Sequence, residues 1–339
     1  MIPAGIFKNS IKGFLLPISS LMNDETVSEI MINGPDEIWA ERKGKLTLTD
    51  CAFPCSGALD AALTNIAQFS GRHIGEDRPI LEAHLPDGSR VEAVLPPLAE
   101  NGPVVAIRRF SKSDLTVARL VEFGTLTGPA VEFLAQAVAS KKNVVVSGGT
   151  GSGKTSLLGA LSSLIPDGER IVVIEDTREV QLQKSHVVYL ETRSADERGR
   201  GRITIRDLLK ATLRLRPDRI VVGEVRGGEA LDLIQAMTSG HGGSMTTAHA
   251  NTPADTVRRL ETMAMMADTG LPLPALRAQV ASAVELIVQI ERVADGRRLV
   301  SEITRVVGEK EGEGYVLEKA FYRERGHELV RAQQRKGGE

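Results

Sequence analysis

Two different hydrophobic patterns follow one another along the chain. In its first third, apolar and polar residues alternate over 27–32 and 37–40, as in half-buried strands. Residues 59–69 carry apolar side chains at helical spacing, and another strand is predicted at 104–107. An Asp-Gly pair at 87–88 predicts a hairpin turn between two further short strands. The first part is therefore predicted to be a small mixed α/β unit.

Beyond residue 128 the apolar residues form continuous runs instead. Three β-branched runs occupy residues 144–146, 171–174 and 220–222. Such runs are typical of strands that are buried on both faces of a parallel sheet. Helical patterns lie among and after them, at 155–164, 205–215 and 229–237. This alternation predicts a doubly wound α/β domain whose sites lie at the carboxyl ends of its strands.

The length of 339 residues and the change of pattern predict two domains. We expect an N-terminal α/β domain at 1–110, a linker at 111–127 and the doubly wound domain at 128–339. Strand-like runs return after Val284, and the polar tail from Arg331 is expected to fray.

Composition and charge narrow the class of protein. Apolar residues make up 42% and charged residues 25%, which is the balance of a soluble globular protein. The net charge of −2 gives no general attraction for nucleic acid, and no run approaches the roughly 20 apolar residues of a membrane helix. Cys51 and Cys55 are too few for a disulfide scaffold or a four-cysteine zinc site, which favours a cytoplasmic protein. The amphipathic start at 6–14 is expected to cover a neighbouring domain.

The most specific motif lies directly after the first buried strand and directly before a helix. It is the P-loop pattern Gly148-Gly149-Thr150-Gly151-Ser152-Gly153-Lys154-Thr155, which is followed by Ser156. Glycines let backbone N–H groups surround an oxyanion, and the following helix adds its N-terminal partial positive charge. Lys154 is expected to reach the β- and γ-phosphates of ATP as a catalytic group, and Thr155 to ligate Mg²⁺. A flexible glycine-rich turn is the alternative, and the flanking strand and helix argue against it.

Acidic residues follow the other two buried strands. Glu175, Asp176 and Glu179 come after the second strand, and Glu224 comes after the third. Generic P-loop ATPases place an Asp just before such a Glu, whereas this chain has Gly223. We therefore expect Glu224 to support the metal or its waters without that Asp. The acids after the second strand are expected to contribute to the same role. Crowded carboxylates repel one another unless a cation and phosphates intervene, so solvated loop acids are the weaker alternative, except for Asp176.

A third group of polar residues occupies 240–251, where a run of Ser and Thr precedes His249. This pattern fits a strand that delivers a polar group to the nucleotide. The alternative is a purely structural histidine, and that alternative is stronger for His241 than for His249. Arginines near these elements could stabilise charge at the γ-phosphate from a neighbouring subunit. They are Arg193, Arg202, Arg206, Arg214, Arg216 and Arg226. Most are expected to form ordinary ion pairs, and Arg206 and Arg214 are the two that we expect at the nucleotide.

With these groups, the sequence resembles the secretion and pilus motor ATPases of bacteria, and among them most of all the tight-adherence (Tad) pilus assembly ATPases. The P-loop and six other stretches carry the resemblance over nearly the whole chain. These stretches are Leu85-Pro86-Asp87-Gly88-Ser89-Arg90-Val91, Ile107-Arg108-Arg109-Phe110, Ile174-Glu175-Asp176-Thr177-Arg178-Glu179, Leu213-Arg214-Leu215-Arg216-Pro217-Asp218-Arg219, Val222-Gly223-Glu224-Val225-Arg226 and Thr247-Ala248-His249-Ala250-Asn251. The cysteine-rich zinc insert of some pilus extension motors is missing, which argues against that branch.

The resemblance implies a homohexamer with a RecA-like P-loop domain, a smaller PAS-like N-terminal domain, and a nucleotide site between the two. By position, Glu179 resembles the base that orients the attacking water, Glu224 the Walker B acid at the metal, and His249 the histidine-box residue. Arg90 and Arg108 resemble N-terminal residues that approach the phosphates. The implied activity is hydrolysis of ATP with Mg²⁺. It would be coupled to work at the inner membrane on a platform protein that feeds pilin subunits or secreted proteins.

Two other classes of function stay open. Conjugative relatives of this family serve DNA transfer, so a nucleic-acid transfer motor is the main alternative. The near-neutral charge and the aromatic content of 4% weaken it, because strand-tracking channels combine basic grooves with stacking aromatics. The third class is a nucleotide switch that binds without hydrolysis. The presence of Lys154, Glu179 and Glu224 argues against that class.

Overall fold

The computed structural model describes residues 10–42, 44–109, 115–195, 199–310, 314–324 and 327–332. The chain divides into two compact units, one formed by 1–112 with 196–200 and the other by 113–195 with 201–339. The first residues of the expected amphipathic segment (6–9), the polar stretch at 111–114 and the tail after 332 lie outside the described residues. None of the helices described is both long enough and apolar enough to cross a membrane.

The first unit is built on a six-stranded antiparallel sheet in the order β3-β2-β1-β6-β5-β4. The strands are β1 (Val27–Asn33), β2 (Ile38–Arg42), β3 (Lys45–Leu48), β4 (Ile80–His84), β5 (Arg90–Val94) and β6 (Val104–Arg108). Its helical elements are η1 (Leu16–Ile18), α2 (Ser19–Asn23) and α3 (Ser56–Phe69). The strands and the helix predicted for this part of the chain are confirmed, with small shifts of their ends.

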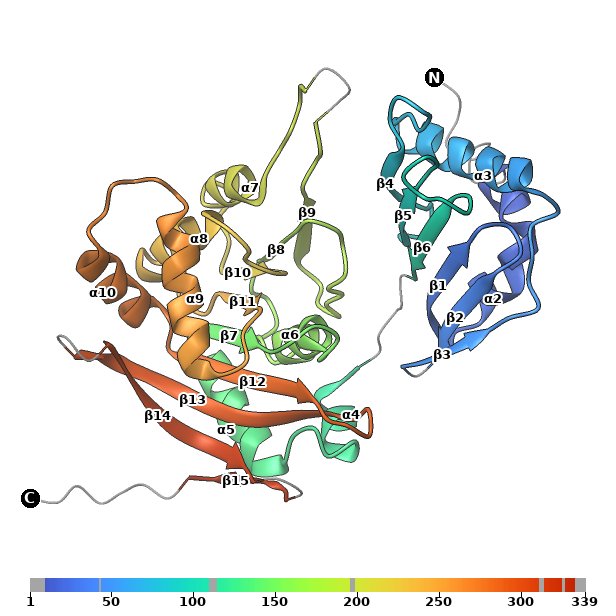
Figure 1. Ribbon diagram of the computed structural model, residues 1–339. Coiled ribbons are helices and arrows are strands. Elements are labelled where there is room, and N and C mark those ends of the chain that lie inside the picture. Colours follow the sequence, from blue (N-terminus) through green and yellow to red (C-terminus); the bar gives the residue numbers. More distant parts are fainter. Residues whose placement is uncertain are drawn as a thin grey trace, which may run out of the picture. The chain divides into compact units, whose positions relative to one another are not determined.

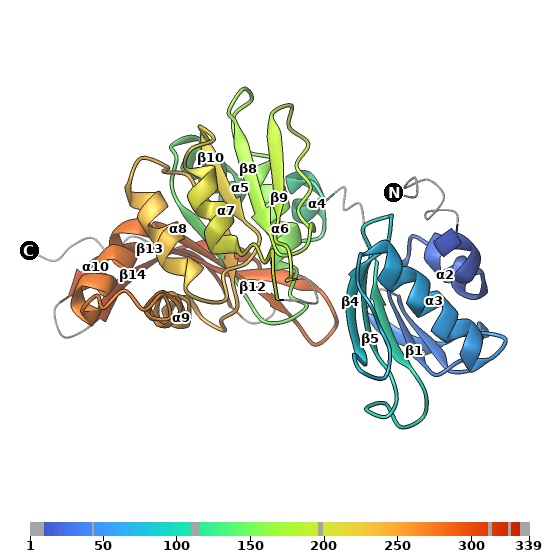
Figure 2. The same cartoon turned by 90° about the horizontal axis from the view of Figure 1, so that it is seen from above.

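One face of this sheet carries the helices, and Figure 2 shows α2 and α3 on the same side of the strands. Val91 and Ile107 on neighbouring strands are buried in one apolar core with Leu59 of α3. Successive residues of a strand point to opposite faces, so Arg90 and Arg108 face the side that the helices do not cover.

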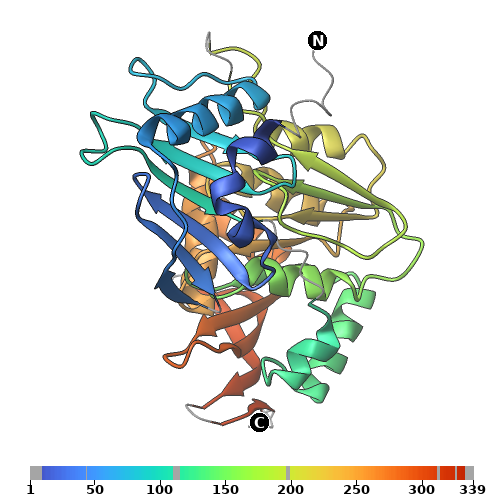
Figure 3. The same ribbon diagram turned by 90° about the vertical axis from the view of Figure 1, so that its right-hand side faces the viewer.

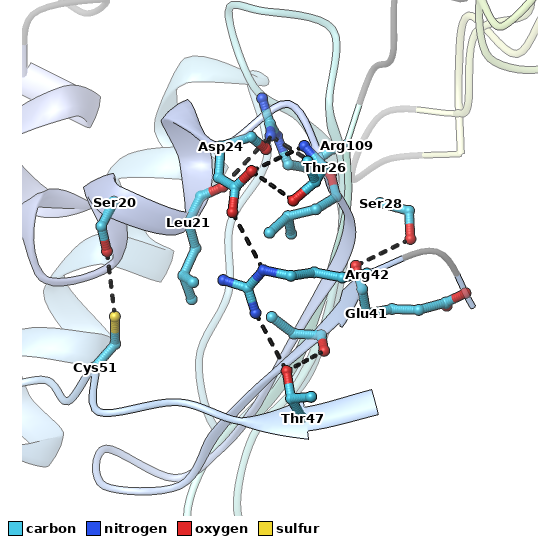
Figure 4. A network of polar contacts seen from close by, with 12 residues as sticks. Ser20, Leu21, Asp24, Thr26, Ser28, Glu41, Arg42, Thr47, Cys51 and Arg109 are labelled. Atoms are coloured by element: carbon cyan, nitrogen blue, oxygen red, sulfur yellow. Dashed lines mark hydrogen bonds and ion pairs between the residues drawn. The ribbon is translucent and has the colours of Figure 1, made fainter. Parts of the chain in front are cut away.

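Arg109, directly after β6, is hydrogen-bonded to the segment that connects α2 and β1 (Figure 4). Its guanidinium donates to the carbonyl oxygens of Leu21 (3.4 Å), Asp24 and Val27 (3.5 Å). The carboxylate of Asp24 in turn accepts from Nε of Arg42 on β2 at 3.2 Å. A guanidinium offers several donors at once, so it ties the end of β6 to the carbonyl groups of this turn.

The second unit contains a nine-stranded sheet in the order β15-β14-β13-β12-β7-β11-β10-β8-β9. Its parallel strands are β7 (Val144–Ser147), β8 (Ile171–Glu175), β9 (Val187–Glu191), β10 (Arg219–Val222), β11 (Met245–Ala248) and β12 (Leu286–Arg292). The antiparallel strands at one edge are β13 (Arg298–Lys310), β14 (Gly314–Arg323) and β15 (Leu329–Arg331). In Figure 3 this antiparallel part lies at the bottom of the picture.

Helices cover both faces of the parallel part of this sheet (Figure 1). One core contains residues of α4 (Val117–Glu122), α5 (Gly128–Ala139) and α6 (Lys154–Ser162). The other contains residues of α7 (Ile205–Thr212), α8 (Glu229–Thr238), α9 (Pro253–Met265) and α10 (Leu273–Ala283). On β7, Val144 and Val146 belong to the first core and Val145 to the second. The predicted doubly wound α/β arrangement is confirmed.

Two segments of the second unit differ from the structure predicted for them. Helix α4 lies inside the segment expected as a linker, and Val117 and Leu120 are buried in the core of the unit. The helix predicted at 205–215 ends at Thr212. It stops early because Arg216 has a positive φ of 54° and Pro217, which has no backbone N–H, follows.

Candidate nucleotide site

The P-loop connects the carboxyl end of the fully buried strand β7 to α6. Three of its positions require glycine, one because a side chain would not fit and two because of the backbone conformation. A Cβ on Gly148 would lie 2.2 Å from the carbonyl oxygen of Ile290, so no side chain fits there. Gly151 and Gly153 have positive φ values of 68° and 91°, which favour glycine. Gly149 is half-buried and Thr150 is exposed at the tip of the loop.

The remaining P-loop residues close the loop and begin the helix. The Ser152 hydroxyl and the Lys154 ammonium both donate to the carbonyl oxygen of Gly149 at 2.9 Å. Lys154, Thr155 and Ser156 are half-buried in the first turn of α6. The first N–H groups of a helix have no partner within it, so this end of α6 suits an anion.

The carboxyl end of β8 carries one buried and one exposed glutamate. Glu175 is only 4% exposed, and its carboxyl group accepts from the N–H groups of Glu179 (3.1 Å) and Val180 (3.0 Å). Burial raises the pKa of Glu175 to about 7, although the two backbone hydrogen bonds act in the opposite direction. Glu179 itself is exposed, and so is Asp176, whose carboxylate accepts from the Thr192 hydroxyl at 3.3 Å.

At the end of the neighbouring strand β10, Glu224 follows Gly223 and is half-buried. Its Oε2 accepts from Nε of Arg226 at 2.8 Å and forms an ion pair with the same guanidinium. Arg226 also lies 4.0 Å from Asp176, so it joins the acids of β8 and β10. Because β8 and β10 are parallel neighbours, both sets of acids lie at the carboxyl ends of the parallel strands, where the P-loop also lies. This side of the sheet is called the sheet edge below.

His249 reaches the same edge from β11, which lies between β7 and β10. Burial lowers the pKa of His249, and the nearby Lys154 ammonium lowers it further, while the carboxylate of Glu224 acts in the opposite direction. The imidazole is therefore neutral near pH 7 and has both a hydrogen-bond donor and an acceptor. His241 precedes β11 and lies at the opposite edge of the sheet.

A buried polar cluster next to His249 in the sequence joins Ala250 to β7, β12 and α9. The carbonyl oxygen of Ala250 accepts from the Ser147 hydroxyl (3.4 Å) and from the Gln289 amide (3.1 Å). The Thr256 hydroxyl of α9 donates to the Ser147 hydroxyl at 2.7 Å. These bonds tie the end of β11 to β7 and β12, so they fix the segment that carries His249 relative to the P-loop.

The donor set at this edge fits a magnesium ion. Mg²⁺ prefers oxygen ligands, and proteins hold it through one or two side chains together with substrate phosphates. The Thr155 hydroxyl and the Glu224 carboxylate are oxygen donors of this kind. Among the described residues there is no group of three or more His, Cys, Asp or Glu side chains that could hold a metal ion alone.

The arginines expected at the nucleotide lie at different places. Arg206, at the start of α7, pairs with Asp232 of α8 at 2.8 Å. Arg214 is exposed before the amino end of β10, whereas the P-loop follows the carboxyl end of β7. Within its own unit, Arg214 is therefore at the opposite edge of the sheet from the P-loop.

Arg90 and Arg108 belong to the first unit and lie opposite each other on the paired strands β5 and β6. Arg90 also pairs with Glu82 on β4 at 2.9 Å. The two strands thus present adjacent positive side chains on the uncovered face of that sheet.

Two further arginines near the P-loop were missed by the sequence analysis. Nε of Arg298, the first residue of β13, donates to the carbonyl oxygen of Gly151 at 3.1 Å. The guanidinium of Arg292, at the end of β12, lies 3.8 Å from the position of a Cβ on Gly151. Strand-like runs after Val284 were predicted, but nothing local indicates that these strands lie beside the P-loop.

Comparison with known proteins shows close relatives. Residues 15–337 match the family described as type II/IV secretion system protein. The chain is 33% identical over 301 residues to a putative conjugal transfer protein of Mycobacterium tuberculosis, covering 87% of this chain and 85% of that protein. It is 37% identical over 292 residues to the conjugal transfer protein TrbB of Rhizobium radiobacter, covering 85% and 86%. It is also 35% identical over 321 residues to the type IV secretion system protein PtlH of Bordetella pertussis, covering 87% and 94%.

Solved structures share the fold. The ATPase DotB of Legionella pneumophila matches with a TM-score of 0.58 and 22% identity, covering 84% of this chain and 77% of that one. The pilus retraction motor PilT with bound ADP matches with a TM-score of 0.58 and 20% identity, covering 95% and 84%. The predicted RecA-like α/β fold and the resemblance to the secretion and pilus motor superfamily are confirmed. The chain belongs to the family of type II/IV secretion system proteins.

Proposed function

We propose that this chain is a motor that hydrolyses ATP within a ring of six copies and powers pilus assembly or protein secretion across the bacterial envelope. One observation carries this proposal. The P-loop after β7 and the acids after β8 and β10 lie at one edge of the same parallel sheet. Membership in the type II/IV secretion family supports ATPase activity.

We assign the roles at this edge as follows. Lys154 binds the β- and γ-phosphates together with the backbone N–H groups of the P-loop. Thr155 and Glu224 would hold Mg²⁺, which neutralises phosphate charge when bound. Glu179 orients the attacking water. The neutral His249, held by the cluster around Ala250, offers a hydrogen bond to the γ-phosphate or to that water.

Arginine side chains that do not lie beside the P-loop are also part of the proposed site. Arg90 and Arg108 are adjacent on one face of the first unit, and Arg214 is exposed. We propose that these side chains stabilise the phosphate charge within the ring, because Arg is always charged and binds phosphate with two donors. Arg206 already pairs with Asp232, so we expect it to act mainly by fixing α7 against α8.

Membership in the family supports the proposed partners and location. We propose that the ring works in the cytoplasm, at the inner membrane, on a platform protein of a pilus or secretion machine. The relatives compared above are named for secretion and conjugal transfer, so the tight-adherence branch stays a prediction.

Steady-state hydrolysis of ATP by the purified chain tests the proposal. Lys154→Ala should abolish turnover while the fold is kept, since the half-buried ammonium donates to the carbonyl oxygen of Gly149 and is proposed to bind the phosphates. Lys142→Ala is the matched control, because Lys142 pairs with Glu285 on the surface. Glu224→Gln should still bind ATP but hydrolyse it slowly. Turnover by Lys154→Ala at the wild-type rate would refute the assignment.

A nucleic-acid transfer motor is the second candidate, because two of the relatives are named conjugal transfer proteins. The two candidates differ in their response to single-stranded DNA. Stimulation of ATP hydrolysis by single-stranded DNA that disappears as salt is raised would favour the second candidate. Hydrolysis that DNA does not change would favour the first.

A further inference from the structure

The first observation concerns how Glu175 is bound at the end of β8. Its Oε1 accepts from the N–H groups of Glu179 (3.1 Å) and Val180 (3.0 Å), and its Oε2 lies 3.3 Å from the same N–H of Val180. The carboxyl group therefore spans the turn that leads from β8 to Glu179. This turn is exposed at Asp176 and Arg178 but anchored at its base by a buried side chain.

The second observation concerns Gly223, which stands where generic P-loop ATPases have an Asp. A Cβ at this position would lie 2.8 Å from Cγ, 3.0 Å from Oε1 and 3.3 Å from Cδ of Glu175. The φ of Gly223 is outside the left-handed region, so the backbone does not require glycine here. The reason for glycine is the space that the Glu175 side chain occupies.

Two hydrogen bonds also tether the backbone of Gly223 to neighbouring strands. Its N–H donates to the carbonyl oxygen of Ile174 at 2.9 Å. Its own carbonyl oxygen accepts from the buried Thr247 hydroxyl at 2.7 Å. A side chain at 223 would therefore displace Glu175 rather than shift β10.

We propose that Glu175 is the positioning residue for Glu179, and that Gly223 is glycine in order to make room for it. The buried carboxyl group of the site thus comes from β8 and takes the place of a side chain on β10. This inference rests on the proposed function, in which Glu179 orients the attacking water. It predicts that Glu175 acts on the chemical step through the backbone of Glu179 and leaves nucleotide binding to the P-loop.

Kinetics of ATP hydrolysis by variants at these two positions test the inference. Glu175→Ala should lower kcat by about 100-fold, the effect of misplacing a reacting group by about 1 Å, with little change in KM. Glu175→Gln keeps an acceptor oxygen and should retain kcat within about tenfold, the equivalent of one lost hydrogen bond. Glu191→Gln is the matched control, because Glu191 is the exposed register partner of Glu175 on β9.

The steric link is tested by a double-mutant cycle. Gly223→Ala should lower kcat in the wild-type background and have little further effect in the Glu175→Ala background, because the side chain that it displaces is gone. Equal effects of Gly223→Ala in both backgrounds would overturn the proposed link. A kcat of Glu175→Ala at the wild-type level would overturn the positioning role.

Hydrogen exchange of the amides of Glu179 and Val180 separates this inference from the proposed function. Glu175→Ala should remove the protection of both amides, and Glu191→Gln should leave it unchanged. If the wild type does not hydrolyse ATP, the proposed function fails and the exchange result alone decides the inference. Unchanged protection in folded Glu175→Ala would overturn it. If the alanine variant does not fold, faster exchange of both amides in Gly223→Ala supports the inference and unchanged exchange overturns it.

Discussion

Glu175 and His249 are titratable residues whose surroundings move their pKa values in opposite directions. Burial raises the pKa of the Glu175 carboxyl group, against the backbone hydrogen bonds that it accepts. Burial and the Lys154 ammonium lower the pKa of the His249 imidazole. Both shifts favour the uncharged side chain near pH 7. Lys154, Glu179 and Glu224 are the residues at this end of the strands that are proposed to meet the phosphates, water and metal.

Replacing Glu175 by Gln should make stability less dependent on pH. The folded-state pKa of about 7 lies above the ordinary value of 4.5, so the folded protein binds this proton more tightly. The stabilising contribution is complete below about pH 4.5 and is lost as the pH rises through about 7, and it amounts to at most about 3 kcal/mol. The free energy of unfolding of the wild type, measured with urea, should therefore fall relative to Glu175→Gln between about pH 5 and pH 8. The same pH dependence in both proteins would show that Glu175 is not desolvated.

At the residue scale, the sequence predicts sites whose residues lie within one short motif. It does not predict contacts between residues that are far apart in the sequence. The P-loop from Gly148 to Thr155 could be predicted because its glycines, lysine and threonine act within one turn. The closeness of Glu175 to Gly223 could not, because the two residues meet only when β8 and β10 pair. The departure at Gly223 was visible in the sequence, but its reason is the space filled by another strand's side chain.

The hairpin between β12 and β13 is the element that borders the P-loop from the side of the antiparallel strands. Arg298 donates to Gly151 and packs near Gly153, whereas the adjacent Arg297 pairs with Asp295 in the hairpin turn. One residue of the pair therefore contacts the phosphate loop and the other does not.

Arg298→Ala should weaken the binding of ATP by roughly fivefold, the effect of one lost hydrogen bond of about 1 kcal/mol that holds the loop. Arg297→Ala removes the same charge from the same hairpin and should leave the affinity unchanged. Titration with a fluorescent ATP analogue measures both. Equal losses in the two variants would mean that charge alone, and not the contact with Gly151, affects binding.

Strand β10 begins with an arginine that is completely buried. Nε and Nη2 of Arg219 donate to the two carboxylate oxygens of Glu169 at 2.5 and 3.2 Å. A guanidinium without its partner in this place would be a buried, unpaired charge. The ion pair therefore fixes the amino end of β10, whose other end carries Glu224.

Glu169→Ala should destabilise the second unit by about 3 kcal/mol, because it leaves the guanidinium of Arg219 buried and unpaired. The control is Asp295→Ala, which breaks the exposed pair with Arg297 and should have little effect on stability. The midpoints of thermal unfolding measure the difference. Similar midpoints in the two variants would contradict the burial of Arg219.

At the element scale, the pattern predicted many of the strands and the helices α3, α6, α7 and α8, but not which elements are neighbours. The β-branched runs on β7, β8 and β10 identified buried parallel strands, because burial on both faces leaves no alternation. The insertion of β11 between β7 and β10, and the pairing of β12 with β7, depend on contacts between distant segments. The placement of His249 and Arg298 could therefore be found only from the structure.

The whole chain consists of two units, each with its own apolar core. The proposed phosphate ligands are divided between them, with the P-loop in the second unit and Arg90 and Arg108 in the first. Length and the change of hydrophobic pattern are the features from which two domains were predicted.

The proposed ring predicts the mass of the protein in solution. With Mg²⁺ and a non-hydrolysable ATP analogue, light scattering should give about six times the chain mass of 36.5 kDa. Specific ATPase activity should then fall when the protein is diluted, because arginines from neighbouring copies are lost. A single-chain mass with nucleotide, together with full activity at high dilution, would contradict the ring.

The most direct test of the site is a hydrogen-exchange footprint of the wild-type protein with Mg²⁺ and a non-hydrolysable ATP analogue. Three segments that are distant in sequence should become protected together: 148–156, 175–180 and 223–226. Joint protection would show that the P-loop and the acids of both strands surround one triphosphate. Protection of the P-loop alone, or of none of these segments, would contradict that arrangement.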